Sequence, residues 1–400
     1  CRDPALVGAN LWTEKIVEYQ PVWVNGANIV WAWDAWDHLV QYFDNTKPGY
    51  DTIAEHPELF DFNYTNGTAS VDWLHNNGLD YDSIHDQIVF SSRQMCEIYI
   101  IDHSTTTAEA ASHTGGNYGK GGDLLYRWGN PEAYGRGTLA DRKLFYEHCP
   151  RWIPQGFPNA GRISIFNNGN NRPAGNYSSV DVIIPPTDAN WNYTIAGVQA
   201  FGPDSAEWSY TDPVPTNFYD VAISGAFIMP NGNFIVTDGM NGKIFETDSN
   251  KTKLWEYKGT ANGSGPATQG TNPSGTNIFK ASFYDLSYGA FNGQTLTPGL
   301  PIEINPISYT CSMPMAGIDG KEIAEEVFVF PNPAKDIITV KLNSDAVVSC
   351  KLYDVSGRVV LSTRNTGGNF TIDVSKLGSG IYFLEVSGNG KRGVKKIIKE

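Results

Sequence analysis

Imidazole, guanidinium and carboxamide side chains recur together in this sequence. They form two sets, His75, Asn76 and Arg93, then His148, Asn168 and Arg172. A neutral imidazole can attack an electrophile or move a proton. An arginine fork donates hydrogen bonds in pairs to a tetrahedral oxyanion. Preorganised donors of these types can stabilise negative charge that develops on oxygen atoms in a transition state.

Histidine is unevenly distributed along the chain. All seven histidines lie before residue 149, namely His38, His56, His75, His85, His103, His113 and His148. A lone histidine is more often a structural or surface residue than a catalytic one. Arg172, likewise, could form a surface salt bridge. These structural roles of His75 and Arg172 stay open as alternatives to the catalytic one.

The glycine-rich stretch around Lys120 is easily mistaken for a phosphate-binding loop. Such a loop requires Gly-Lys followed by Ser or Thr at the start of a helix, whereas Lys120 precedes Gly121-Gly122 and a predicted strand. The five cysteines form neither CxxC pairs nor short metal-binding spacings. We therefore expect no nucleotide, no other cofactor and no metal site.

The composition favours many short strands over long helices. The chain has 400 residues with 41 Gly, 23 Pro and 12% aromatic side chains, but only 18% charged ones. Residues 326–400 hold 11 basic and 7 acidic side chains, which leaves 18 and 36 for residues 1–325. So acidic a body is a poor nucleic-acid binder. No apolar run approaches the roughly 20 residues that span a bilayer, so we expect no membrane span.

An apolar strand that ends in two aromatic residues, one apart, recurs along the first 260 residues. The pairs are Trp31 and Trp33, Tyr126 and Trp128, Trp208 and Tyr210, and Trp255 and Tyr257. Strand meanders that repeat every 40 to 50 residues or so are typical of β-propeller blades, because one meander buries its faces only by stacking on its neighbours. We predict blades at 73–130, 148–210 and 225–257, the outer part of one at 10–34 and the start of another at 277–310. A β-sandwich with accidental similarity is the alternative.

The end of the chain has a different pattern. A stretch rich in proline and then in polar residues precedes it, and we place the linker at 316–325. Residues 326–400 contain seven short alternating apolar runs, which predict a small immunoglobulin-like β-sandwich. The expected organisation is thus a propeller over 1–315, a linker over 316–325 and a sandwich over 326–400.

Motifs in the last 75 residues identify the small domain. Pro331-Asn332-Pro333-Ala334, Leu352 to Arg358, Leu377 to Tyr382 and the basic end Lys395 to Lys399 resemble the type IX secretion C-terminal sorting domain. The resemblance implies recognition of residues 326–400 by the type IX secretion machinery and passage across the outer membrane. We expect a secreted protein or one attached to the outer surface. A carbohydrate-binding sandwich is the alternative, but residues 326–400 contain no Trp for stacking on a sugar.

Motifs in the larger part resemble the arylsulfate sulfotransferase family. They are Trp73-Leu74-His75-Asn76-Asn77, the stretch from Lys120 to Pro131, and His148 followed by Asn168-Gly169-Asn170-Asn171-Arg172. The resemblance implies an all-β, six-bladed propeller, truncated at its N-terminus because the sequence opens in the middle of a blade pattern. It also implies sulfuryl transfer from a phenolic sulfate donor to a phenolic acceptor through a sulfo-histidine, without a nucleotide donor. Its catalytic residues would be His75, His148 and Arg172, and Arg93, Asn76, Asn168 and Ser282 would bind substrate.

The sequence departs from the family pattern on a late blade. The family nucleophile is expected within Phe279 to Tyr284, where Ser282 stands in its place. A serine hydroxyl without an adjacent base is a poor nucleophile at neutral pH, so His75 or His148 would have to replace the missing histidine. The alternatives are a non-catalytic secreted propeller that has lost the nucleophile, and a polysaccharide hydrolase or lyase, for which no paired-carboxylate motif was found.

Overall fold

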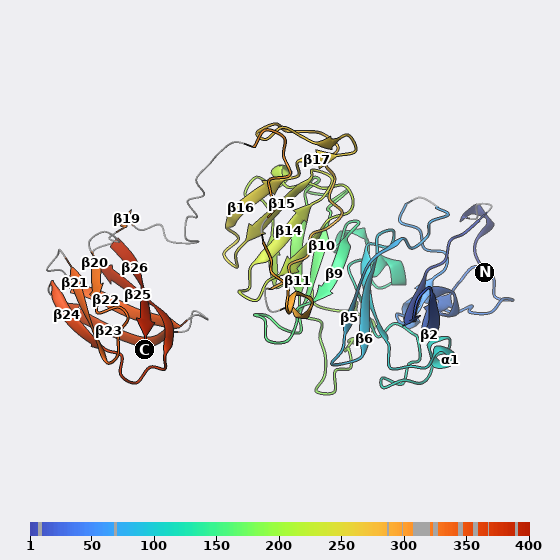
Figure 1. Cartoon of the computed structure of the whole chain (residues 1–400). Coiled ribbons are helices and arrows are strands. Elements are labelled where there is room, and N and C mark those ends of the chain that lie inside the picture. The colour runs from blue at the N-terminus through green and yellow to red at the C-terminus, as the bar shows by residue number, and fades with distance from the viewer. Residues whose placement is uncertain are drawn as a thin grey trace. The chain divides into compact units, whose positions relative to one another are not determined.

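The chain folds into two compact units, Cys1–Ser308 and Tyr309–Glu400. The computed structural model (Figure 1) describes residues 1–6, 10–67, 70–285, 288–297, 299–306, 321–322, 327–342, 347–354, 359–366, 368–388 and 391–400. Both units consist mainly of antiparallel sheets, so the all-β prediction is confirmed. Most of the predicted linker at 316–325 lies outside the described residues.

Three four-stranded antiparallel sheets form most of the first unit. Their strands, in order, are β5 (Asn76–Asp82), β6 (Gln87–Ser92), β7 (Glu97–Asp102) and β8 (Tyr126–Trp128); β9 (His148–Trp152), β10 (Ile163–Asn167), β11 (Ser179–Ile183) and β12 (Trp208–Tyr210); and β13 (Gly225–Ile228), β14 (Phe234–Asp238), β15 (Lys243–Thr247) and β16 (Lys253–Lys258). In each sheet consecutive strands pair, which is the meander of a propeller blade. Each of the three predicted repeats therefore contains one four-stranded meander of the kind expected for a propeller blade, and we call these three sheets blades.

The first strands of the three blades lie side by side. Asn77 Nδ2 on β5 donates to the carbonyl of Glu147 just before β9, at 2.8 Å. A Cβ added to Gly78 would lie 2.7 Å from the Cys149 amide nitrogen, and one added to Gly225 on β13 would lie 2.9 Å from the Cys149 sulfur. Only glycine permits strands to approach so closely. The described residues contain three complete blades, and the predicted number of six stays a prediction.

Three of the four aromatic pairs lie on the fourth strands β8, β12 and β16, and those on β8 and β12 contact the following segment. Residues i and i+2 of a strand share a face, and on β8 this face is buried. Tyr126 Oη donates to Gly202 O and Trp128 Nε1 donates to Pro203 O, both at 2.7 Å. On β12, Trp208 stacks on Phe234 of the following blade.

Shorter elements complete the first unit. They are the hairpin β1 (Lys15–Val22) and β2 (Gly26–Asp34), the pair β3 (Leu39–Val40) and β4 (Phe60–Asp61), the helix α1 (Thr107–Ala110), the pair β17 (Ala261–Asn262) and β18 (Gly265–Pro266), and the 3-10 turns η1 (Pro4–Leu6), η2 (Ala35–Asp37), η3 (Ile53–Glu55), η4 (Pro131–Tyr134), η5 (Leu139–Asp141), η6 (Pro215–Asn217) and η7 (Gly289–Phe291). The hairpin matches the partial blade predicted at 10–34.

The segment at 277–310, predicted to begin a further blade, differs from the expectation. Its described residues contain no strand, although Ser224 N donates to Phe279 O at 3.0 Å beside β13. Phe279, Phe283 and Tyr284 are exposed. Because the described residues of this segment bury no apolar face, little free energy is available to hold them in a strand ladder.

The second unit is a two-layer sandwich. One sheet has the order β19 (Lys321–Glu322), β26 (Lys391–Lys399), β25 (Gly380–Gly388), β22 (Val347–Asp354) and β23 (Val359–Thr366); the other is β20 (Val327–Phe330), β21 (Ile337–Leu342) and β24 (Asn369–Asp373). Alternating residues such as Ile338, Val340, Leu352 and Leu384 form its core. The seven predicted strands are confirmed as β20 to β26.

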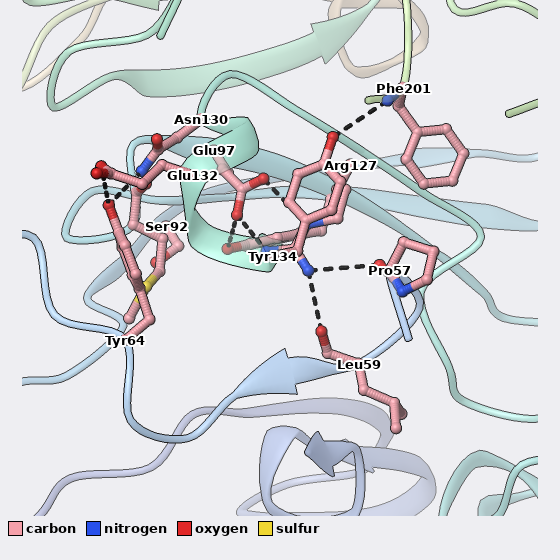
Figure 2. Close-up of polar contacts among 12 residues, drawn as sticks. Pro57, Leu59, Tyr64, Ser92, Glu97, Arg127, Asn130, Glu132, Tyr134 and Phe201 are labelled. Carbon is pink, nitrogen blue, oxygen red and sulfur yellow. Dashed lines mark hydrogen bonds and ion pairs between the residues drawn. The ribbon is translucent and has the colours of Figure 1, made fainter. Parts of the chain in front are cut away.

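A buried ion pair crosses the two outer strands of the first blade (Figure 2). Arg127 Nε donates to Glu97 Oε1 at 3.0 Å, and Nη1 donates to Leu59 O at 2.9 Å. The Tyr134 ring lies under the guanidinium, with its centroid 4.2 Å away. Both charged side chains are almost fully buried. Burial raises the pKa of Glu97, and the adjacent Arg127 opposes that rise.

We expect Arg127→Met to destabilise the protein by about 3–5 kcal/mol, because it leaves the Glu97 carboxylate buried without its partner. Urea denaturation at pH 7 measures the loss. The double variant Glu97→Gln/Arg127→Met should recover part of it. The control is Arg162→Met, which breaks the more exposed pair with Glu207 and should cost at most about 1 kcal/mol. Equal losses in Arg127→Met and the control would contradict this account.

Candidate active site

The candidate residues of the first two blades lie at the same end of their sheets. His75 precedes β5 and Arg93 follows β6, and Arg93 N donates to His75 O at 3.1 Å. In the second blade His148 begins β9 and pairs with Phe166 near the end of β10, just before Asn168. In an antiparallel meander the start of the first strand meets the end of the second. Blade topology alone therefore brings these side chains to one end.

The environment of His148 defines its tautomer. Its Nδ1 lies 2.7 Å from Asn168 Oδ1. The Asn168 amide nitrogen already donates to Asp220 O and Ile223 O, so its oxygen must face the imidazole and Nδ1 must carry the proton. In the neutral ring the lone pair is then on Nε2.

Burial keeps the His148 imidazole uncharged. The residue is 4% exposed, and desolvation lowers its pKa to about 4; the nearby positive charge of Arg93 acts in the same direction, and the hydrogen bond with Asn168 opposes it. The ring is therefore neutral at pH 7, which is the form that can act as a nucleophile.

His75 is the second imidazole of the site and is more accessible. Its side chain is 42% exposed, and its Nδ1 forms a hydrogen bond with Asp72 Oδ2. A carboxylate on Nδ1 holds the ring in one orientation, as in acid–base catalysis. Glu14 lies nearby, where its Oε1 accepts from Asn76 N at 3.2 Å, and burial raises the pKa of Glu14. The charge of His75 also contributes, after burial and Arg93, to lowering the pKa of His148.

The positive charge of Arg93 contributes to the lowered pKa of His148 and opposes the rise in the pKa of Glu147 that burial causes. Its guanidinium lies over the Tyr146 ring, 4.7 Å from the centroid. Within the described part of the chain this guanidinium donates no hydrogen bond and joins no ion pair. Its donors can therefore be used by a ligand.

Arg172 is held by its own loop instead. Its Nε donates to Tyr177 O at 3.1 Å and its Nη2 donates to Ser179 Oγ at 2.7 Å. The loop turns tightly, because a Cβ on Gly169 would lie 1.7 Å from Tyr177 O. No described contact joins Arg172 to His148, whereas the positive charge of Arg93 contributes to the lowered pKa of His148.

Two polar side chains at this end are buried without partners in the described chain. Both amide atoms of Asn76 and both carboxyl oxygens of Glu147 have no hydrogen bond. Burial, together with the charge of Glu97, raises the pKa of Glu147 well above its usual value. This shift favours the protonated form of the Glu147 carboxyl. Buried polar groups normally have partners, so unpaired ones beside free Arg93 donors are consistent with a site that binds a polar ligand.

The sequence interpretation missed Asp72 and Glu147. Asp72 lies three residues before His75, close enough that the motif could have indicated it. Glu147 adjoins His148, but strand alternation assigns neighbours to opposite faces, and nothing local indicates that its carboxyl lacks partners.

Ser282 makes no described contact with His148. It is exposed and lines a hollow of about 820 Å³ together with Arg151, Phe227, Lys280 and Tyr284. Arg151 is three residues along β9 from His148 and lies over the Phe227 ring at 4.3 Å. Rings and cations are suitable neighbours for an aromatic anion, but no described contact joins this hollow to His148.

Two segments of the chain match known families. Residues 22–275 match the arylsulfotransferase family, and residues 328–400 match the secretion system C-terminal sorting domain. No curated protein matches the chain significantly. Among the described residues no helix is long and apolar enough to cross a membrane.

Several solved structures are similar to parts of the chain. An immunoglobulin-like β-sandwich protein from Bacteroides vulgatus is 21% identical over 19% of this chain and 84% of its own, with a TM-score of 0.17. Virginiamycin B lyase from Staphylococcus aureus is 10% identical to this chain, and the match covers 80% of this chain and 83% of the lyase, with a TM-score of 0.26. The extracellular domain of a one-component system from B. thetaiotaomicron is 12% identical to this chain, and the match covers 91% of this chain and 46% of that domain, with a TM-score of 0.27. These scores are too low to support a functional argument.

We expect Glu147→Gln to stabilise the protein at pH 7–8. The folded-state pKa of Glu147 lies above its unfolded value, so the unfolded state releases a proton as the pH rises above about 4.5 and wild-type stability falls. The glutamine variant lacks this loss. Its advantage in urea denaturation should be absent near pH 4 and grow by up to about 1.4 kcal/mol per pH unit above 4.5. The exposed Glu18→Gln variant is the control, and an advantage that does not grow with pH would refute a protonated Glu147.

Proposed function

Since the chain belongs to the arylsulfotransferase family and carries a type IX sorting domain that directs it to the outer surface or the extracellular space, we propose that it is an aryl-sulfate sulfotransferase. It transfers a sulfuryl group from a phenolic sulfate ester to a phenolic acceptor. The observation that carries the proposal is the neutral, oriented His148 beside the unpaired guanidinium of Arg93.

Arg93 and Asn76 provide the donors that this reaction requires. The sulfuryl group carries negative charge on its non-bridging oxygens in the transition state, and fixed donors favour that state over the ground state. The free Arg93 fork can donate two hydrogen bonds to such oxygens. The buried amide of Asn76, which has no partner among the described residues, can add another.

His148 is the nucleophile in this proposal. Its Nε2 lone pair attacks sulfur, an N–S bond forms, and the bond between sulfur and the aryl oxygen breaks. The departing phenolate takes a proton, which the accessible His75, oriented by Asp72, can supply. A second phenol then gives its proton to His75 and attacks sulfur, which restores His148. No nucleotide donor takes part.

Ser282 favours a second candidate function. It occupies the position at which the sequence pattern leads one to expect the family nucleophile, and His148 is not among the residues that line its hollow. A chain that had lost its nucleophile could still bind aromatic anions in that hollow without turning them over. A non-catalytic surface protein is therefore the alternative that the experiment must distinguish.

We expect the purified chain to release 4-nitrophenol from 4-nitrophenyl sulfate, faster when phenol is added as acceptor. His148→Gln should reduce kcat/KM by at least about 1,000-fold, and Arg93→Met by about 100- to 1,000-fold. His56→Gln, at a histidine paired with Asp51 and Glu58, is the matched control. Since the pKa of His148 is about 4, kcat/KM should hold as the pH is lowered and fall only below about pH 4.

The intermediate separates the two functions. With ³⁵S-labelled donor and an alkaline quench, which preserves a sulfo-imidazole, the label should map to the peptide that contains His148. A folded wild type with neither turnover nor label, but with measurable donor binding, would reject the enzyme and favour the binding protein. Gain of turnover in Ser282→His alone would show that the nucleophile has been lost.

A further inference from the structure

A second cluster of ionisable side chains lies outside the site described above. His38 follows η2, and His113 and Asp123 belong to the loop between α1 and β8. Nδ1 of His38 and Nδ1 of His113 lie 2.7 and 2.8 Å from the same oxygen, Asp123 Oδ1. The three atoms are all within 4.8 Å of one another. Two imidazoles and a carboxylate thus converge on one point.

Both ring nitrogens of His38 face oxygen acceptors, although a neutral imidazole carries only one N–H. Its Nε2 lies 2.8 Å from Ala110 O, and a carbonyl only accepts, so Nε2 carries a proton. In a neutral ring the Nδ1 lone pair would then face the Asp123 carboxylate, acceptor against acceptor. A positive species must lie between them, either a second proton on the ring or a metal cation. A histidine that donates its other N–H to a backbone carbonyl is the usual arrangement around a bound metal.

His113 adds a ligand that a simple ion pair does not need. Its ring meets that of His38 edge-on, at 87° with the centroids 5.9 Å apart, so the two Nδ1 atoms point to the shared oxygen rather than stacking. Its side chain is 60% exposed, while His38 is fully buried. One side of the cluster is therefore open to an ion and to water from the solvent.

The surrounding chain fixes the orientation of His38. The Trp33 ring stacks on the His38 ring with an angle of 3° between the two planes. Trp33 Nε1 donates to Gly122 O at 2.7 Å. A Cβ on Gly122 would lie 2.0 Å from Ala110 O and 2.6 Å from His38 Nε2. Position 122 therefore requires glycine. The loop backbone at this position packs closely against the His38 ring and against the Ala110 carbonyl, to which His38 Nε2 donates.

We propose that His38, His113 and Asp123 bind one divalent transition-metal ion, with Zn²⁺ as the best match, through Nδ1, Nδ1 and Oδ1. Nitrogen and carboxylate ligands suit this ion, and water can complete a tetrahedral shell. Ligands of tetrahedral Zn²⁺ lie about 3.3 Å apart for bonds of about 2.0 Å, so the atoms need to separate by about half an ångström. The ion ties the segment after β2 to the glycine-rich loop of the first blade.

The test uses the tag-free full chain after removal of metal by dialysis against a chelator. Titration with Co²⁺ should give a visible d–d spectrum that saturates at one ion per chain, and Zn²⁺ should displace it. His113→Ala, at an exposed position that the fold tolerates, should weaken Co²⁺ binding by at least about 10- to 100-fold, the range found for loss of metal-site groups. Zn²⁺ should raise the Tm of the wild type but not of His113→Ala.

His85→Gln is the matched control, because His85 pairs with one carboxylate, Asp82, and has no second imidazole. It should bind Co²⁺ as the wild type does. The absence of a saturable spectrum in the wild type, or equal affinity in His113→Ala, would overturn the proposal and leave a proton between His38 and Asp123. Asp123→Asn, which keeps the shape of the carboxylate, should weaken binding as His113→Ala does; unchanged binding in this variant would equally overturn it.

Discussion

The Glu97–Arg127 pair is the constraint from which much of the first blade follows. Burying two opposite charges costs free energy unless they pair with each other and their remaining donors form hydrogen bonds. Arg127 meets the second condition by donating to Leu59 O. The segment near β4 is thereby fastened to the outer strands of a blade. The same pair affects the site, because the charge of Glu97 contributes, after burial, to the raised pKa of Glu147. A structural ion pair thus shapes the electrostatics beside His148.

The blades also depend on one another for the orientation of the site. Asn168 belongs to the second blade but uses its amide to reach the backbone just before β13 of the third. Asn77 of the first blade reaches the Glu147 carbonyl before β9. The tautomer of His148 is therefore fixed jointly by the second and third blades. An isolated blade could carry the same residues without fixing which nitrogen holds the proton.

The sequence predicts whatever depends on local pattern. Alternating apolar runs, glycine turns and aromatic pairs located the three blades, and the sequence motifs identified His75, Arg93 and His148 as candidate site residues. The sequence pattern did not predict contacts that depend on detailed geometry. The hydrogen bond from Arg172 to Tyr177 O depends on the conformation of a tight turn, which no residue pattern indicates. The missing partners of Glu147 are likewise visible only when every neighbouring donor has been placed. The convergence of His38 with Asp123, 85 residues apart, is of the same kind.

The contact of Gly78 and Gly225 with Cys149 has a consequence for dynamics. The Cys149 thiol is buried where three inner strands meet, and burial raises its pKa, so a thiol reagent reaches it only when neighbouring sheets separate. The hydrogen-bonded ladder inside each sheet need not break for that to happen. Its alkylation kinetics would therefore report how often blades part while each sheet remains intact, a motion that global unfolding experiments do not resolve.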